Sequence, residues 1–396
     1  MPTLHLLMGM TGLVALGIAA GYATLTVIAV MRWQLRKSPT GISGAPPVTI
    51  LKPLCGDEPR LYENLRSFCQ QDYRETQVIF GVRDAADDAL SAAQRLQAEL
   101  PTLPIDVVIN PQSQCSNRKV SNLINMLESA RHDVLVLADS DTFVGPDYLA
   151  AVAAPLLDGQ VGLVTCIHRD VPTQRVWARL GAMYVNEWYM PSVLLAWLFG
   201  HQGYASGQTL CLRRDTLQAI GGLGVIGNHL ADDYRLGELV RRLGQRIVLS
   251  PYLLRTKHDE TSLTSLSRHE LRWMRTLKVL RPRSYRLLFL SFSLPLAALG
   301  AALTITQPTL AAAAWMLLLT AVVMRLILHF VHRLGDARPL FADLWLLPAR
   351  DFLIFWIWCR SFFASRLTWR DNEFEVGADG IMRSASGIPT CPETGL

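Results

Sequence analysis

Two carboxylates separated by one residue, Asp139 and Asp141, follow an apolar run at 134–138. Such a run is typical of a strand buried on both faces of a parallel sheet, and ligands of these sheets bind where the strands end. Mg²⁺ and Mn²⁺ prefer carboxylate oxygens and bridge to phosphates, so the pair is a candidate metal and diphosphate site. The same triplet also forms ordinary turns, because Asp and Ser side chains hydrogen-bond nearby backbone.

Further acidic residues follow other predicted strands. Asp84 comes after the apolar residues 77–82, and Asp232 with Asp233 follows the glycine-bounded segment 221–227. Taken singly, each is explained by a turn, a helix cap or a charge at a helix N-terminus. Three acidic clusters in this order favour a sugar-nucleotide site. No Gly-x-Gly-x-x-Gly or Walker sequence follows a predicted strand, which argues against a dinucleotide or P-loop site.

A basic amphipathic stretch covers residues 266–286, and within it Arg268, Arg272 and Arg275 fall on one helical face. A membrane-surface helix that binds lipid phosphates explains this pattern. A second explanation is a helix whose cation and Trp273 close over a diphosphate and an acceptor. The residues alone leave both explanations open.

The elements that must position these residues alternate between apolar runs and helical patterns, which predicts a Rossmann-like, mostly parallel α/β sheet. The expected strands are 48–51, 77–82, 105–109, 133–138, 162–167, 209–212 and 247–249. The expected helices are 60–71, 87–100, 119–130 and 234–243.

The composition predicts a membrane protein with a large soluble part, since 50% of the 396 residues are hydrophobic and 18% are charged. Residues 6–31, 287–305 and 310–331 are long and apolar enough to cross a bilayer. Basic residues follow the first of these segments, which places the next domain in the cytoplasm. Segment 351–364 is shorter and contains Asp351 and Arg360, so spanning, re-entrant and interfacial arrangements all remain open.

The net charge of +5 is explained by a membrane and not by nucleic acid, because the basic residues crowd beside apolar segments without interleaved aromatics. The seven cysteines are scattered and include no Cys-x-x-Cys pair. Reduced thiols are therefore expected, and neither disulfides nor a zinc site.

The sequence resembles the inverting glycosyltransferases of the family-2/21 type, which have a GT-A fold. Within them it is similar to ceramide glucosyltransferase and, most closely, to the bacterial hopanoid-biosynthesis-associated glycosyltransferases. The resemblance covers about 48–376 and rests on the residues at 51–56, 117–122, 139–141, 231–234 and 272–273. The family's Gln/Arg-x-x-Arg-Trp motif differs here at its first position, which is His269.

The resemblance implies a role for individual residues. The catalytic residues would be Asp233 as base, with Asp232, Arg272 and Trp273 beside it. A UDP-sugar donor would be bound by Lys52, Pro53, Asp84, Lys119, Asp139 and His269, and a divalent Mg²⁺ or Mn²⁺ would be bound by Asp141 and Asp139.

The implied enzyme is a metal-dependent glycosyltransferase of the bacterial inner membrane with a cytoplasmic catalytic domain. It would move N-acetylglucosamine from a UDP-sugar to a hopanoid polyol. The alternative is transfer of glucose from UDP-glucose to ceramide or another sphingolipid. A processive polysaccharide synthase and a non-catalytic membrane protein are less favoured alternatives. The aromatic segment 177–199 is the expected access route for the lipid acceptor.

The expected organisation has six parts. They are an N-terminal transmembrane helix with its basic flank (1–37), a linker (38–47), a GT-A domain (48–265), a basic interfacial helix (266–286), C-terminal membrane helices (287–366) and a tail (367–396) that is disordered after residue 381.

Overall fold

The computed structural model of this protein describes residues 2–37, 45–56, 58–201, 203, 205–334, 338–363, 367–369, 372–376 and 380–384. The expected linker 38–47 lies mostly outside these residues. The chain divides into two compact units. The helical unit comprises Met1–Arg36, Pro172–Gly200 and His258–Ser365, and the sheet unit comprises Lys37–Val171, His201–Lys257 and Arg366–Leu396.

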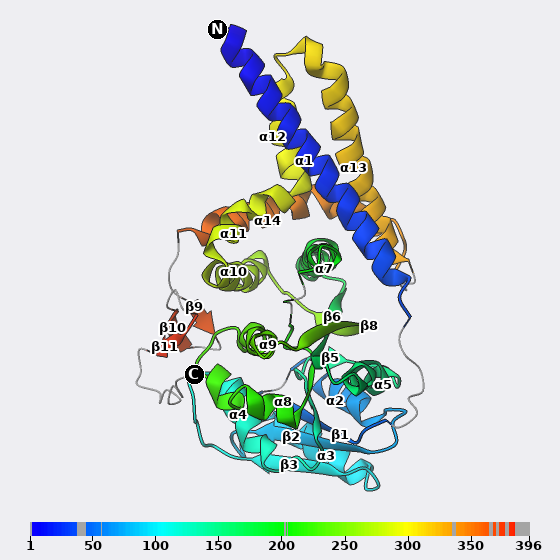
Figure 1. The fold of residues 1–396 in the computed structure, drawn as a ribbon, viewed down its shortest axis with the longest axis vertical. Coiled ribbons are helices and arrows are strands. Elements are labelled where there is room, and N and C mark those ends of the chain that lie inside the picture. Colours follow the sequence, from blue (N-terminus) through cyan, green and yellow to red (C-terminus); the bar gives the residue numbers. More distant parts are fainter. Residues whose placement is uncertain are drawn as a thin grey trace. The chain divides into compact units, whose positions relative to one another are not determined.

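The sheet unit is built on an eight-stranded sheet with the strand order β3-β2-β1-β4-β7-β6-β8-β5 (Figure 1). The first four strands in this order pair in parallel. β7 pairs antiparallel with β4 and β6, and β5 pairs antiparallel with β8. The strands are β1 (Val48–Pro53), β2 (Thr76–Val82), β3 (Ile105–Ile109), β4 (Val134–Leu137), β5 (Thr142–Phe143), β6 (Val161–Pro172), β7 (Leu210–Arg213) and β8 (Arg246–His258). The predicted Rossmann-like α/β sheet is confirmed.

Helices connect the strands and cover the sheet. They are α2 (Leu61–Cys69), α3 (Ala89–Glu99), α4 (Arg118–Leu127), α5 (Tyr148–Ala153), α8 (Arg214–Ala219) and α9 (Asp232–Arg242). In the parallel register of β1 and β4, Leu51 lies opposite Leu137. Lys52 and Asp139 therefore follow at the same edge of the sheet, where the carboxyl ends of parallel strands meet.

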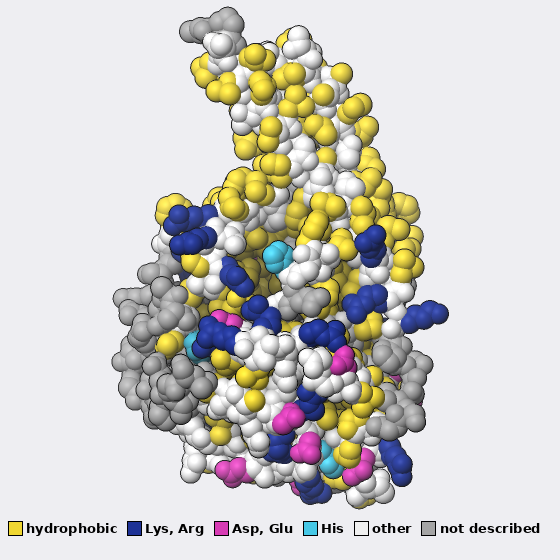
Figure 2. Space-filling view, viewed as in Figure 1, with side chains coloured by type: hydrophobic (Ala, Val, Ile, Leu, Met, Phe, Trp, Pro, Cys, Tyr) yellow, Lys and Arg dark blue, Asp and Glu magenta, His cyan; other side chains and the backbone are white. Residues whose placement is uncertain are grey.

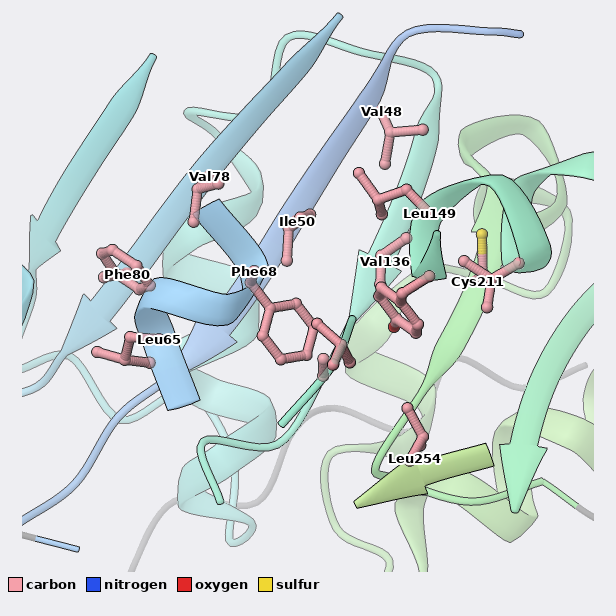
Figure 3. Packing of buried hydrophobic residues seen from close by; sticks show 14 of the residues in the cluster. Val48, Ile50, Leu65, Phe68, Val78, Phe80, Val136, Leu149, Cys211 and Leu254 are labelled. Carbon is pink, nitrogen blue, oxygen red and sulfur yellow. The ribbon is translucent and has the colours of Figure 1, made fainter. Parts of the chain in front are cut away.

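The apolar core of the sheet unit lies between the sheet and its covering helices. Figure 3 shows side chains of β1, β2 and β4 packed against α2, with Leu65 and Phe68 supplied by that helix. Both of these side chains are completely buried. Burial of an aliphatic or aromatic side chain of this size stabilises a fold by about 1.5–3 kcal/mol. The strand ends are thus held by a rigid apolar layer.

The helical unit contains two helices that are long and apolar enough to cross a membrane, within the described residues. They are α1 (Pro2–Gln34) and α13 (Ala311–Arg333). In Figure 2 the column of these helices shows hydrophobic and other uncharged side chains on the visible face. The other helices of this unit are α6 (Val176–Tyr184), η2 (Val185–Tyr189), α7 (Met190–Leu198), α10 (Leu263–Leu280), α11 (Pro282–Arg286), η4 (Leu287–Ser291), α12 (Ser293–Thr304), η5 (Pro308–Leu310), η6 (Leu344–Leu346) and α14 (Leu347–Ser361).

The single helix expected over 287–305 is broken. The axis bends by 70° between Pro282–Ser291 and Ser293–Thr304. Pro295 explains the break, because its ring would clash with the carbonyl four residues earlier, at Ser291, and it has no N–H to donate. The α12 helix alone is about 18 Å long and does not cover a bilayer core of about 30 Å.

Glycines allow α1 and α12 to approach closely. A Cβ on Gly12 would lie 2.6 Å from the carbonyl oxygen of Gly300, and a Cβ on Gly300 would lie 2.7 Å from that of Gly12. We expect Gly12→Ala to destabilise the protein by about 1–3 kcal/mol, because the helices must move apart. Unfolding in detergent measures this effect. Gly17→Ala is the matched control on α1, where a Cβ meets nothing within 4 Å; equal stability of the two variants would contradict the close packing.

The expectation of disorder after residue 381 is wrong for Met382–Ser384. This segment is β11 of a three-stranded antiparallel sheet with β10 (Asn372–Val376) and β9 (Leu367–Trp369). Backbone hydrogen bonds give the reason: Met382 N–H donates to Asn228 O, and Leu230 N–H donates to Gly380 O. Residues 385–396 lie outside the described residues.

Candidate active site

Two ion pairs at the sheet edge join α4 to Asp139, which follows β4, and to Asp232 at the start of α9. Lys119 Nζ lies 2.5 Å from Asp139 Oδ1 and 3.7 Å from Asp232 Oδ2. Burial alone would lower the pKa of Lys119, but the charges of Asp139 and Asp232 outweigh it and raise that pKa. The ammonium group is therefore a fixed positive charge among carboxylates.

Asn117 connects α4 and α9, a role that the sequence analysis missed. Its Oδ1 accepts hydrogen bonds from the backbone N–H groups of Lys119 and Val120, at 3.0 and 3.3 Å, and so caps α4. Its Nδ2 donates to Asp232 Oδ1 at 3.3 Å and to His229 O at 3.2 Å. An Asn directly before an apolar periodic segment is a helix-cap signal that could have identified it.

Lys52 supports the Asp139 backbone from inside the protein. Its side chain is completely buried, its Nζ donates to the Asp139 carbonyl oxygen at 2.7 Å, and it lies 3.4 Å from the ring centroid of Phe68. Burial lowers the pKa of Lys52 to about 7, against the opposing effect of Asp141 and Asp139. The structure thus places Lys52 beneath the Asp-Ser-Asp turn, with Pro53 next to it at the end of β1.

Asp141 lies in an acidic environment at this turn. Desolvation and the negative charges of Asp139 and Glu58 raise the pKa of Asp141. The residue is exposed, so solvent screens part of this effect. Ser140 Oγ donates to Glu58 Oε2 at 2.5 Å, so Glu58, which the sequence analysis missed, holds the turn from the other side. No signal in the sequence connects Glu58 with residues more than eighty positions later.

Asp139 and Asp141 fit a divalent cation that is shared with a substrate. Among the described residues, no group of three or more His, Cys, Asp or Glu side chains could hold a metal by itself. Mg²⁺ commonly binds one or two carboxylates and completes its shell with water and substrate phosphates. Asp139 and Asp141 supply two carboxylates after one strand, which matches this way of binding the cation together with a substrate.

Asp233 is held by two backbone groups at the start of α9. Its Oδ1 accepts a hydrogen bond from Tyr234 N–H at 2.7 Å, and its Oδ2 accepts one from Gly207 N–H at 2.9 Å. Burial raises the pKa of Asp233 to about 6, Asp232 adds to the rise, and Lys119 opposes it. A fixed carboxylate with a pKa near neutrality can take a proton from a hydroxyl.

Gly207 is a further residue that the sequence analysis missed. Besides its bond to Asp233, a Cβ at this position would lie 2.8 Å from Lys119 Nζ and 3.2 Å from Asp139 Oδ2. The flanking residue is also fixed, because Ser206 N–H donates to Thr165 Oγ1 at 3.0 Å. Gly207 therefore lies between the ion pair and the Asp233 carboxylate.

Gly207→Ala tests how tightly this part of the site is packed. We expect a roughly tenfold to hundredfold loss of turnover, because the new methyl group displaces Lys119 or Asp139. The backbone itself tolerates alanine, since Gly207 is not among the glycines with positive φ. Enzyme assays on purified variants measure the loss. The control is Gly159→Ala, where a Cβ meets nothing within 4 Å; wild-type activity of Gly207→Ala would contradict the packing argument.

Asp84 reaches the same edge of the sheet but takes part in a local turn. It follows β2, which pairs with β1 so that Gly81 lies opposite Pro53. Its exposed side chain accepts a hydrogen bond from Ala86 N–H at 2.9 Å. Its oxygens also face solvent, so it remains accessible to a ligand.

The Arg-Trp motif forms a separate group on α10, in the helical unit. His269 Nδ1 lies 2.9 Å from Glu260 Oε1, and the His269 and Trp273 ring centroids are 4.2 Å apart. Trp273 stacks on Tyr184 at 5.3 Å, and Arg272 is on the same helix. The sheet unit thus brings together Lys119, Asp139, Asp232, Asp233 and Gly207, whereas His269, Arg272 and Trp273 belong to the other unit.

The aromatic segment expected to admit the acceptor is only partly packed inward, since most of its aromatic side chains are half-buried. Residues 172–200 belong to the helical unit, whereas the sequence analysis placed them in one domain with the sheet. Tyr184 is buried, and Trp188 Nε1 donates to Ser291 Oγ at 3.0 Å. Aromatic side chains gain most by packing against one another, which explains this arrangement. Phe199, at the end of the segment, is 62% exposed.

Comparison with known proteins gives consistent matches. The model of Glycosyl transferase family 21 matches residues 11–382. Ceramide glucosyltransferase 1 of Caenorhabditis elegans is 22% identical over 362 residues, which are 88% of this chain and 75% of that protein. Ceramide glucosyltransferase 3 of the same organism is 22% identical over 59% of this chain and 51% of that protein.

A similar solved structure is a mannosyltransferase from Pyrobaculum calidifontis in complex with GDP-Man and Mn²⁺. It has a TM-score of 0.50 and 17% identity, and the match covers 90% of this chain and 99% of that chain. At this identity the match concerns the fold, and it agrees with the GT-A fold class expected from the sequence.

Proposed function

The chain belongs to glycosyl transferase family 21, and from this membership we propose that it transfers a sugar from a UDP-sugar to the hydroxyl group of a membrane lipid. The observation that carries the proposal is the cluster of Lys119, Asp139 and Asp233 at one sheet edge. The apolar helices α1 and α13 support action at a membrane. We place the enzyme in the bacterial inner membrane with the sheet unit in the cytoplasm, following the basic residues after α1.

The proposed reaction is a single displacement that inverts the anomeric carbon. Asp233 takes the proton of the acceptor hydroxyl while its oxygen forms the bond to the anomeric carbon. The bond from that carbon to the UDP oxygen breaks, and its electron pair leaves with UDP. Lys119 offsets the charge that develops on the diphosphate. Inversion follows because one base acts and no covalent intermediate forms.

Other residues of the expected site receive proposed roles. A divalent Mg²⁺ or Mn²⁺, held by Asp139 and Asp141, would supply further positive charge at the diphosphate. Asp84 contacts the nucleoside, and Lys52 with Pro53 supports the strand ends beneath it. Arg272, Trp273 and His269 match the position of the family's Arg-Trp motif, and we assign them to the leaving group and the acceptor.

We propose a hopanoid polyol as acceptor and UDP-N-acetylglucosamine as donor. The ceramide glucosyltransferases among the relatives favour a second candidate, in which glucose passes from UDP-glucose to ceramide or another sphingolipid. A processive polysaccharide synthase must thread its polymer through a bundle of spans. The described residues contain two spanning helices, or three if the bent pair counts as one span, which disfavours that alternative. The occurrence of the acidic cluster disfavours a non-catalytic protein.

Purified enzyme in detergent tests the proposal with both donors against both acceptors, and mass spectrometry identifies the product lipids. Lipids from a strain lacking the gene should lose the same glycolipid. We expect one donor and acceptor pair to give an inverted product. The proposal would be refuted if the product retained the anomeric configuration of the donor. It would also be refuted if none of the four combinations of donor and acceptor gave a product.

The pH profile tests the assignment of Asp233 as the base. The base must be ionised to act, so kcat/KM should rise with pH around the Asp233 pKa of about 6 and level off above it. Asp232→Asn removes a neighbouring negative charge that raises this pKa, so the rise should move to lower pH. A profile that stays in place in this variant would argue for a different titrating group. Exposed Asp133, replaced by Asn, provides the control that leaves the profile unchanged.

A further inference from the structure

Helix α14 buries a charged side chain and exposes aromatic side chains, the reverse of the usual pattern in a helix that packs on a core. Its buried positions include Arg350, whereas its exposed positions include Phe352 at 48% and Trp356 at 45%. Phe341 and Trp345 precede the helix and are 72% and 68% exposed. Intervals of four and seven residues place Trp345, Phe352 and Trp356 on one side of a helix. An apolar patch of this kind is unfavourable in water and marks a contact surface.

The buried side of α14 is fixed to a charged helix. Arg350 Nη1 and Nη2 donate to the two carboxylate oxygens of Glu270 on α10, at 2.6 and 2.8 Å. Both side chains are almost completely buried, with exposures of 2% and 1%. The α10 helix also contains Arg268, which is exposed, and further cations that are only partly buried. Such a helix remains in contact with water or lipid headgroups, and so does α14, which is attached to it.

A second ion pair attaches α14 to the last third of a membrane span. Arg325 of α13 donates to both carboxylate oxygens of Asp351, at 2.8 and 2.9 Å. The candidate span Pro308–Arg333 has 26 residues, about 39 Å of helix, whereas a bilayer core needs about 30 Å. Its last turns therefore lie near the edge of the core. Phe330 of α13 contacts Phe341 edge to face at 5.5 Å, so the apolar surface of the span continues into the aromatic residues.

We propose that the exposed face of α14 binds the surface of a phospholipid bilayer, with the helix lying in the membrane plane. In Figure 1 α14 crosses the foot of α1, α12 and α13 and does not run alongside them. Its 15 residues measure about 22 Å, too short for the bilayer core. Trp and Phe side chains favour the headgroup level. Arg360, whose guanidinium lies 4.7 Å from the Trp356 ring centroid, is placed to bind lipid phosphate.

The depth of three positions in the bilayer tests this arrangement. The full chain is reconstituted in phosphatidylcholine and phosphatidylglycerol vesicles, with a spin label at residue 345, 352 or 356, attached through a genetically encoded ketone amino acid. Accessibility to oxygen and to a water-soluble nickel chelate gives each depth. We expect equal depths close to the phosphate level. A label replacing Leu319 on α13, which is 63% exposed, reports the core, and one replacing Asp133 reports water.

Two results would overturn the proposal. A spanning or re-entrant helix would separate residues 345 and 356 by about 16 Å in depth, since they are eleven residues apart. A face in contact with water would make all three labels as accessible to the nickel chelate as the label at residue 133. Neither result depends on glycosyl transfer, so the test stands apart from the proposed reaction.

Discussion

Asp233→Asn is expected to reduce glycosyl transfer at least about a hundredfold while UDP-sugar binding is kept. The amide has nearly the size of the carboxylate, but it is a very poor base and cannot take the proton of the acceptor hydroxyl. The ion pair between Lys119 and Asp139 does not involve Asp233 and should persist. Isothermal titration with UDP-sugar and a turnover assay on the same preparation separate binding from chemistry.

The variant must also keep its fold, because Asp233 accepts hydrogen bonds from both Gly207 and Tyr234 N–H groups. An Asn side chain has only one oxygen acceptor, so one of these bonds is lost. A cooperative thermal unfolding transition, lowered only by the loss of one hydrogen bond, excludes a folding defect. Asp133→Asn, at a side chain that is 93% exposed, controls for loss of one negative charge. Turnover above roughly a tenth of the wild-type value would remove Asp233 from the role of base.

The sequence predicted the sheet edge well, because the pattern there is local. Each parallel strand is a short apolar run, and carboxylates follow two of these strands within two to four residues: Asp84 follows β2, and Asp139 and Asp141 follow β4. Since all parallel strands end at one edge, the carboxylates that follow them lie close together, as the topology requires. The antiparallel pairing of β7 with β4 and β6 has no such local signal, and the sequence did not predict it.

The supporting residues could not be predicted, because their contacts join distant parts of the chain. Gly207 matters through Asp233, 26 residues later, and through Lys119. Lys52 has the residue type of a phosphate ligand, but packing against Phe68 and the Asp139 carbonyl buries it. The break before α12 could have been predicted from Pro295, whose effect on a helix is local.

Replacement of Asp141 should have the second large effect, on binding of the donor. Asp139 is already paired with Lys119 at 2.5 Å, whereas Asp141 lies near the like charges of Asp139 and Glu58, which raise its pKa. A divalent cation would relieve this repulsion, so Asp141 is the more dependent of the two on a metal. We expect Asp141→Ala to abolish the increase in UDP affinity that Mn²⁺ or Mg²⁺ produces, a loss of about a hundredfold or about 2.7 kcal/mol.

Isothermal titration of UDP with Mn²⁺ and after treatment with a chelator measures this loss in the wild type, Asp141→Ala and Asp139→Asn. Asp139→Asn should keep part of the metal effect, because its amide oxygen can still face the cation, while Lys119 loses its closest partner. Asp215→Ala, at an exposed carboxylate outside the cluster, should behave as the wild type. If chelator-treated Asp141→Ala transfers sugar at the full wild-type rate, the Asp-Ser-Asp sequence is a structural turn and Lys119 alone offsets the charge of the leaving diphosphate.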